Sequence, residues 1–144
     1  MDGRPVGGKR LATNQRFAIL YNKPEGELVT RNDPAGRKTV FERLPRLPVG
    51  RWIAVGRLDV NSAGLILFTN DGDLTKRLTH PSYNKKKIYH VHLNRNLSRE
   101  DMNRIADGIT LDDGFIQVDA IAYSNPESKR EIGVEIHSGR NRIV

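Results

Sequence analysis

The amino-acid sequence predicts an α+β fold, built on a mostly antiparallel or mixed sheet with few short helices. Three observations support this class. Several segments of strand length are apolar or alternate between apolar and polar residues, glycine and proline lie between them, and the helical patterns are short. About five or six strands with few short helices are typical of an α+β domain.

The first half of the chain is predicted to hold strands and one short helical segment. Arg16 to Asn22 is an apolar run, and Pro24 should end it because proline cannot donate to a sheet ladder. Thr39 to Leu44 favours one or two helical turns, and Arg51 to Asp59 begins as a strand and ends in a polar turn. Leu65 to Thr69 is almost wholly apolar, as in a strand or helix buried on both sides.

The second half is predicted to hold two short helices and three strands. Leu74 to Leu78 and Ser98 to Ile109 have helical patterns, and Ser98 can cap the longer helix. Lys87 to Leu93 alternates between two faces, and Gly114 to Ser124 and Glu131 to His137 also have strand patterns. The buried stripe of the longer helix is predicted to consist of Met102, Ile105 and Ile109.

The composition is that of one folded domain. Residues 1–15 are polar and glycine-rich, so we expect a loose lead-in or linker there, followed by a single domain over residues 16–144. The chain has no cysteine, which excludes disulfides and thiolate metal sites. No apolar run approaches the ~20 residues that span a bilayer, and no signal peptide is evident. We therefore expect a cytoplasmic protein without a membrane partner.

The charge balance favours a polyanionic partner. The formal net charge is +7, from 24 Lys and Arg against 17 Asp and Glu. An excess of this size on a small domain is typical of nucleic-acid binding, although a solvated basic surface is the alternative. Two clusters strengthen the first interpretation: the consecutive Lys85, Lys86 and Lys87, and Arg140 with Arg142.

The segment from Gly56 to Asp73 is the most informative for chemistry. It places one carboxylate, Asp59, in a turn between apolar runs, two residues after Arg57. An acid held on a rigid turn beside a basic group can act as a nucleophile or a base. The residue pattern alone leaves open the more common alternative, that Asp59 only forms the turn.

A series of short segments carries a resemblance to a known family. They are Asn22 to Gly26, Thr30 to Pro34, Leu44-Pro45, Arg51 to Val55, Gly56 to Asp59, Gly64-Leu65, Thr69 to Gly72, and Gly139 to Arg142. In sequence and order they resemble the motifs of the pseudouridine synthases that modify ribosomal RNA. The resemblance covers roughly residues 17–144. It is greatest to the subgroup that contains the small-subunit uridine synthase and large-subunit synthase B.

The resemblance implies isomerisation of a uridine to pseudouridine in ribosomal RNA, most closely large-subunit (23S) RNA, without a cofactor. Asp59 matches the aspartate of that family, which attacks the sugar or the base or abstracts a sugar proton. Tyr89 matches a tyrosine that packs against the target base, although a tyrosine in the core of a strand is the structural alternative. The uridine must be flipped out, because its reacting atoms lie within the base stack.

The remaining site residues are predicted from charge and from the same resemblance. The expected substrate contacts, besides Tyr89, are Arg57, Asn61, Lys23 and Arg140. The expected contacts to the RNA backbone are Lys85, Lys86, Lys87 and Arg142. His90 and His92 share a strand face, but no third ligand is evident in the sequence, so we expect no metal site.

Two parts of the family pattern are expected to be missing. The family's last motif continues past Val144 with an arginine that pairs with the catalytic aspartate, and a small RNA-binding module usually precedes the core. We therefore expect an incomplete sheet with exposed apolar surface, and low activity of this chain alone. The alternatives are a catalytically inactive RNA-binding fragment and a carboxylate-based hydrolase, for which no second acid is identifiable. A monomer is expected.

Overall fold

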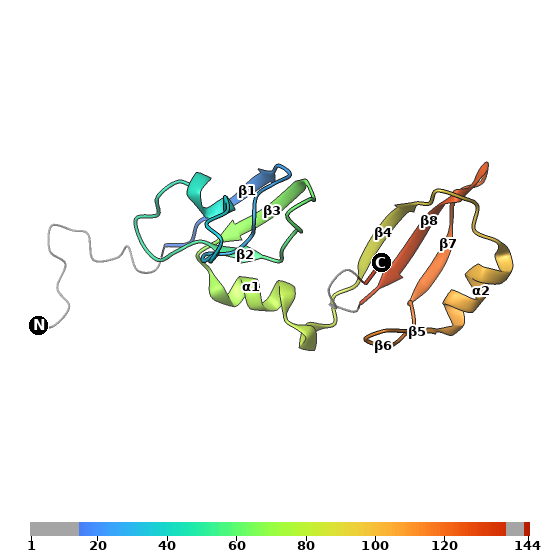
Figure 1. Ribbon diagram of the computed structural model, residues 1–144. Coiled ribbons are helices and arrows are strands. Elements are labelled where there is room, and N and C mark those ends of the chain that lie inside the picture. The colour runs from blue at the N-terminus through green and yellow to red at the C-terminus, as the bar shows by residue number, and fades with distance from the viewer. Residues whose placement is uncertain (1–14, 138–142) are drawn as a thin grey trace, which may run out of the picture. The chain divides into compact units, whose positions relative to one another are not determined.

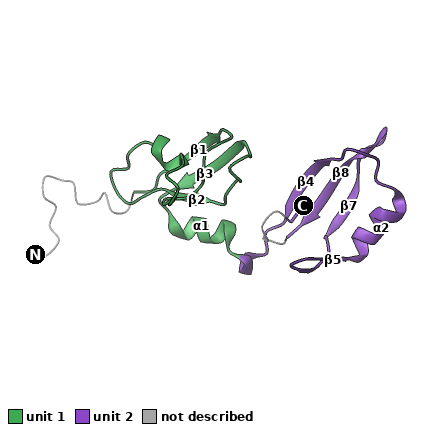
Figure 2. Cartoon of the chain, in the orientation of Figure 1, with its two compact units in different colours: residues 1–80 green, residues 81–144 purple. Residues whose placement is uncertain are grey.

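The computed structural model describes residues 15–137 and 143–144, which fall into two compact units. Unit 1 ends at His80 and unit 2 begins at Pro81 (Figure 2). Each unit has its own antiparallel sheet and its own helices, which confirms the predicted α+β class. The expectation of one domain over residues 16–144 stays a prediction. No helix within the described ranges is both long and apolar enough to cross a membrane.

Unit 1 is a three-stranded sheet with two short helices (Figure 1). Its elements are β1 (Ala18–Lys23), the 3₁₀ helix η2 (Val40–Arg43), β2 (Ile53–Val55), β3 (Gly64–Thr69) and α1 (Gly72–Thr79). The strand order is β1-β3-β2, and both pairings are antiparallel. β3 is therefore the central strand, hydrogen-bonded to β1 on one side and to β2 on the other.

One face of this sheet carries the core of unit 1. Val40, Trp52, Ile66 and Phe68 are buried together, and the ring of Phe68 meets that of Phe41 edge-on at 5.5 Å between centroids. The predicted burial of β3 on both sides is wrong, because Leu65 is 66% exposed. Strand residues alternate between faces, and the second face of this sheet is not covered along its whole length.

Unit 2 contains a second three-stranded sheet, a two-stranded ribbon and one α-helix. Its elements are the 3₁₀ helix η3 (Pro81–Tyr83), β4 (Lys87–His92), α2 (Arg99–Asp107), β5 (Ile109–Leu111), β6 (Gly114–Ile116), β7 (Ala120–Asn125) and β8 (Ser128–Ile136). The order β4-β8-β7 makes β4 an edge strand, paired antiparallel with β8.

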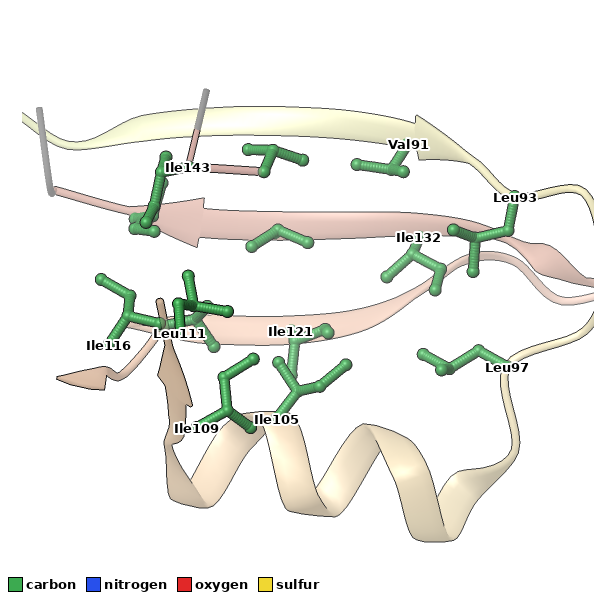
Figure 3. Close-up of a pocket in the computed structure, with 14 residues that line it drawn as sticks. Val91, Leu93, Leu97, Ile105, Ile109, Leu111, Ile116, Ile121, Ile132 and Ile143 are labelled. Carbon is green, nitrogen blue, oxygen red and sulfur yellow. The ribbon is translucent and has the colours of Figure 1, made fainter. Parts of the chain in front are cut away.

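The apolar face of this sheet is turned toward α2. Figure 3 shows Ile105 of α2 and Ile121 of β7 directed into the space between helix and sheet, with Val91 and Ile132 of the neighbouring strands. A cavity of about 220 Å³ lies there, lined almost wholly by aliphatic side chains. Alternate residues of β4 and β8 must therefore face the other way.

Two predictions for unit 2 need correction. Ile109 belongs to β5 and not to the helix, because α2 ends at Asp107 and Gly108 follows with φ 107°. The predicted strand from Gly114 to Ser124 is two strands, β6 and β7, with a break between them. The described residues hold eight strands, more than the sequence predicted, since short strands such as β5 leave little periodic pattern.

Candidate functional site

Asp59 lies in the loop that joins β2 to β3. The two strands form a hairpin in which Val55 pairs with Leu67, and residues 56–63 connect them. Gly56, which begins the connection, and Gly64, the first residue of β3 after it, have positive φ values of 84° and 146°, which other residues adopt only with strain. The two glycines therefore permit the backbone conformation with which the loop leaves β2 and enters β3.

Within the loop, Asp59 opens a tight turn. The backbone N–H of Ser62 donates to the carbonyl oxygen of Asp59 at 2.9 Å. A second backbone bond comes from the segment after β1, where the N–H of Gly26 donates to the carbonyl oxygen of Val60 at 2.7 Å. One hydrogen bond within the turn and one from the segment after β1 thus stabilise the conformation of the turn.

Lys23, the last residue of β1, supplies a third attachment. Its side chain is fully buried, and Nζ donates to the carbonyl oxygens of Ser62 at 2.6 Å, Pro24 at 2.8 Å and Val60 at 3.4 Å. A buried ammonium group needs such partners, because its desolvation is otherwise costly. In this conformation Lys23 is committed to the loop backbone, although the sequence favoured a contact with substrate.

The side chains around this turn are accessible. Asp59, Arg57 and Asn61 are all exposed, so a ligand can reach them without a rearrangement of the unit. The loop therefore combines a carboxylate, a guanidinium and an amide on a backbone fixed from behind by Lys23. This arrangement suits a nucleophile or base whose position must be maintained.

The other predicted contacts belong to unit 2 or lie outside the described residues. Tyr89 is on β4, pairs in register with Val134 and is 37% exposed as a residue. The lysines 85–87 precede or begin β4 and are exposed, with Lys86 Nζ 3.9 Å from Glu135. Arg140 and Arg142 lie outside the described residues.

Unit 1 also contains a basic pocket that sequence reasoning missed. It has a volume of about 390 Å³, is open to solvent and includes Arg31, Arg46 and Arg51 in its lining. The guanidinium of Arg31 lies 4.3 Å from the ring centroid of Phe41 and donates to the carbonyl oxygen of Trp52. Burial lowers the pKa of Arg31, and the charge of Arg51 lowers it further. No spacing in the sequence signals this convergence.

The chain is similar to known proteins over nearly its whole length. The profile of a family described as RNA pseudouridylate synthase matches residues 17–144. Proteins named ribosomal large subunit pseudouridine synthase B are 49% identical in Pseudomonas aeruginosa, over 79% of this chain and 30% of that protein, and 44% identical in Salmonella typhi, over 100% and 50%. The chain therefore spans about a third to a half of the length of these relatives.

A solved structure agrees with the sequence comparison. The protein described as "Crystal structure of pseudouridylate synthase" matches with a TM-score of 0.69 and 25% identity, over 88% of this chain and 54% of that one. The family profile over residues 17–144, the similarity of the whole chain to half of the Salmonella typhi relative, and the likeness to the solved structure all agree. The chain belongs to the RNA pseudouridylate synthase family.

Proposed function

We propose that this chain is the catalytic part of an enzyme that isomerises uridine to pseudouridine in large-subunit ribosomal RNA, with Asp59 as the catalytic carboxylate. The observation that carries the proposal is the exposed Asp59 on a turn anchored by the buried Lys23. The names of the bacterial relatives support the substrate class. The net charge of +7 supports binding to RNA.

The reaction requires no external reactant. The bond between the sugar C1′ and the base N1 breaks, the base turns, a bond forms between C1′ and C5, and the C5 proton passes to N1 through solvent. A carboxylate can assist by attack on C1′ or on the base, or by removal of a sugar proton. Asp59 has the accessibility that each of these roles needs.

The target uridine must leave its stack to reach such a carboxylate. In the proposal Tyr89 stacks on the extruded base, a contact worth roughly 1–3 kcal/mol per base. Arg57 and Asn61, beside Asp59 on the same loop, contact the nucleotide. Lys23 is proposed as a positioning residue, since its ammonium group is occupied by backbone carbonyls.

The remaining basic residues are proposed to follow the RNA backbone. Lys85 to Lys87 are exposed, and Arg142 is proposed for this role from the sequence. Arg140 is proposed, also from the sequence, as a contact to the substrate nucleotide. The enzyme is proposed to act as a monomer, in the cytoplasm, where its RNA is found.

Activity is best tested in a chimaera, because the chain matches only part of its relatives. Residues 17–144 replace the matching segment of the Salmonella typhi relative, and tritium release from ribosomal RNA labelled at uridine C5 is measured. Asp59→Asn should lower the rate by roughly 10²–10⁴-fold or more while RNA affinity is retained. Asp107→Asn, at the exposed end of α2, is the matched control and should be as active as the parent.

A second candidate, RNA binding without catalysis, is favoured by the basic pocket of unit 1. The two are distinguished by the same pair of variants. An inactive parent chimaera that still binds ribosomal RNA, with Asp59→Asn indistinguishable from it, would support the binding module and overturn the proposed enzyme.

A further inference from the structure

The face of the unit 2 sheet that is turned away from α2 carries a cluster of three ligand-type side chains. His90 and His92 are two residues apart on β4 and therefore lie on the same face. Glu131 of β8 is the register partner of His92. The antiparallel pairing of β4 with β8 thus brings a carboxylate from a distant part of the sequence next to the two imidazoles.

The distances fit one metal ion. Oε1 of Glu131 lies 3.4 Å from Nε2 of His90 and 3.9 Å from Nδ1 of His92, and one ligand atom from each residue lies within 4.8 Å of the others. With metal–ligand bonds of about 2.0–2.2 Å, two ligand atoms of a tetrahedral zinc site are about 3.4 Å apart. Small side-chain rotations are enough to bring the three atoms to that spacing.

The surroundings also suit a metal site. Nδ2 of Asn125 donates to Oε2 of Glu131 at 2.7 Å, which orients the carboxylate and leaves Oε1 toward the histidines. Such outer hydrogen bonds are typical supports of metal-binding carboxylates. The register partner of His90 is Gly133, and a Cβ atom added there would meet nothing within 4 Å. The glycine therefore leaves space beside the imidazole of His90.

The cluster is accessible from solvent. The side chains of His90 and His92 are 54% and 68% exposed, and that of Glu131 is 25% exposed. An ion can therefore enter without unfolding the sheet. Three ligands leave the fourth position to water, as in zinc sites that are not closed by protein.

We propose that His90, His92 and Glu131 bind one divalent transition metal ion of the Zn²⁺ class. Two imidazoles and a carboxylate favour Zn²⁺, Cu²⁺ or Ni²⁺ over Mg²⁺, which prefers oxygen ligands. The ion links the edge strand β4, which carries Tyr89, to the central strand β8. The sequence did not suggest this site because the pairing register of β4 with β8, which brings Glu131 to the histidines, cannot be read from it.

Direct titration of the purified chain with Zn²⁺ alone tests the proposal. We expect one ion per chain by isothermal titration calorimetry, a rise in melting temperature with Zn²⁺ because the ion binds the native state, and visible absorption bands of a four-coordinate site with Co²⁺. His90→Gln and Glu131→Gln should each weaken binding by roughly tenfold or more. The double variant His90→Gln/His92→Gln should abolish it.

The matched control removes the other two histidines. His80→Gln/His137→Gln leaves the cluster intact and should bind Zn²⁺ with the parent affinity. All variants are compared by circular dichroism before titration, so that a loss of binding is separated from a loss of folding. Absence of saturable binding at millimolar Zn²⁺ overturns the proposal, as does parental affinity in the double variant His90→Gln/His92→Gln or in Glu131→Gln.

Discussion

The ammonium group of Lys23 donates a 2.6 Å hydrogen bond to the carbonyl oxygen of Ser62, and this bond joins the end of β1 to the turn that opens at Asp59. The same group also reaches the carbonyl of Val60. The position of the exposed carboxylate therefore depends on a side chain that no solvent contacts.

Replacement of Lys23 by methionine should destabilise unit 1 by about 2–4 kcal/mol. Methionine fills much of the space but removes the donor from the carbonyl oxygens of Ser62 and Pro24, while Val60 keeps its bond from the N–H of Gly26. Loss of a partner costs about 1–3 kcal/mol for a group shielded from water. Urea unfolding of the purified chain measures the change. Lys38→Met, at an exposed lysine, is the control and should be within ~0.5 kcal/mol of the parent.

The proposed positioning role of Lys23 predicts a separate kinetic effect. In the chimaera, Lys23→Met should lower kcat under conditions where the protein is folded, with little change in RNA affinity. A folded variant with parental kcat would show that the anchor is not needed for catalysis.

Gly56→Ala should destabilise the chain by about 1–2 kcal/mol. The φ of 84° at Gly56 is unfavourable for alanine, although no atom lies within 4 Å of the added Cβ, so the cost is conformational and not steric. Gly133→Ala is the matched control, because its site is also open but its φ is not in the positive range. In metal-free buffer it should be neutral or slightly stabilising in urea unfolding.

Arg51→Ala should weaken RNA binding through the basic pocket of unit 1. If Arg51 contacts a phosphate, its loss lowers affinity for all RNA sequences and reduces the slope of log K against log salt by about 1. Fluorescence anisotropy with a single-stranded RNA over a KCl series measures both. Arg104→Ala, on exposed α2, should leave the slope unchanged. If the slope of log K against log salt is the same in Arg51→Ala as in Arg104→Ala, Arg51 does not contact an RNA phosphate.

The stability contributed by Asp33 should disappear at low pH. Oδ2 of Asp33 accepts a hydrogen bond from the backbone N–H of Arg37 at 2.6 Å. Oδ1 of Asp33 accepts a second hydrogen bond, at 2.9 Å, from the guanidinium group of Arg37. These bonds hold the pKa of Asp33 below its ordinary value of about 3.9. The contribution is therefore complete above that ordinary value and is lost as the pH falls through the lower, folded-state pKa.

The measurement is the difference in unfolding free energy between the parent and Asp33→Asn, at neutral pH and near pH 2 to 3. The difference should be positive at neutral pH and shrink on acidification. Arg37→Ala should behave in the same way, and the double variant should add little to either change. A difference independent of pH would mean that the ion pair does not stabilise the chain.

The sequence predicts much of the fold because local patterns decide it. Ser98 caps α2 as expected, with the N–H of Asp101 donating to its hydroxyl at 3.1 Å. In β8 the predicted apolar positions Ile132 and Ile136 are buried, as expected. β4 forms where the alternation predicted a strand, but five of its six residues are exposed and only Val91 is partly covered. Leu65 was placed wrongly because an apolar run gives no measure of what covers each face.

The site is less predictable than the fold. The turn at Asp59 could be located from the glycines and polar residues around it, but the burial of Lys23 could not, since only the β1–β3 pairing brings it to that turn. The same limit hid Glu131, which joins His92 through the β4–β8 register. Long-range pairing, and not residue type, decides these contacts.

Lys23 holds the loop that carries Asp59 through main-chain atoms and not through side chains. Every acceptor of Lys23 is a carbonyl oxygen, which the positions of Val60 and Ser62 retain whatever residue occupies them. The side chains at these two positions can therefore be substituted without loss of the hydrogen bonds that hold the turn at Asp59. Side chains near Asp59 can thus change in evolution while Lys23 keeps the backbone around this carboxylate in the same position.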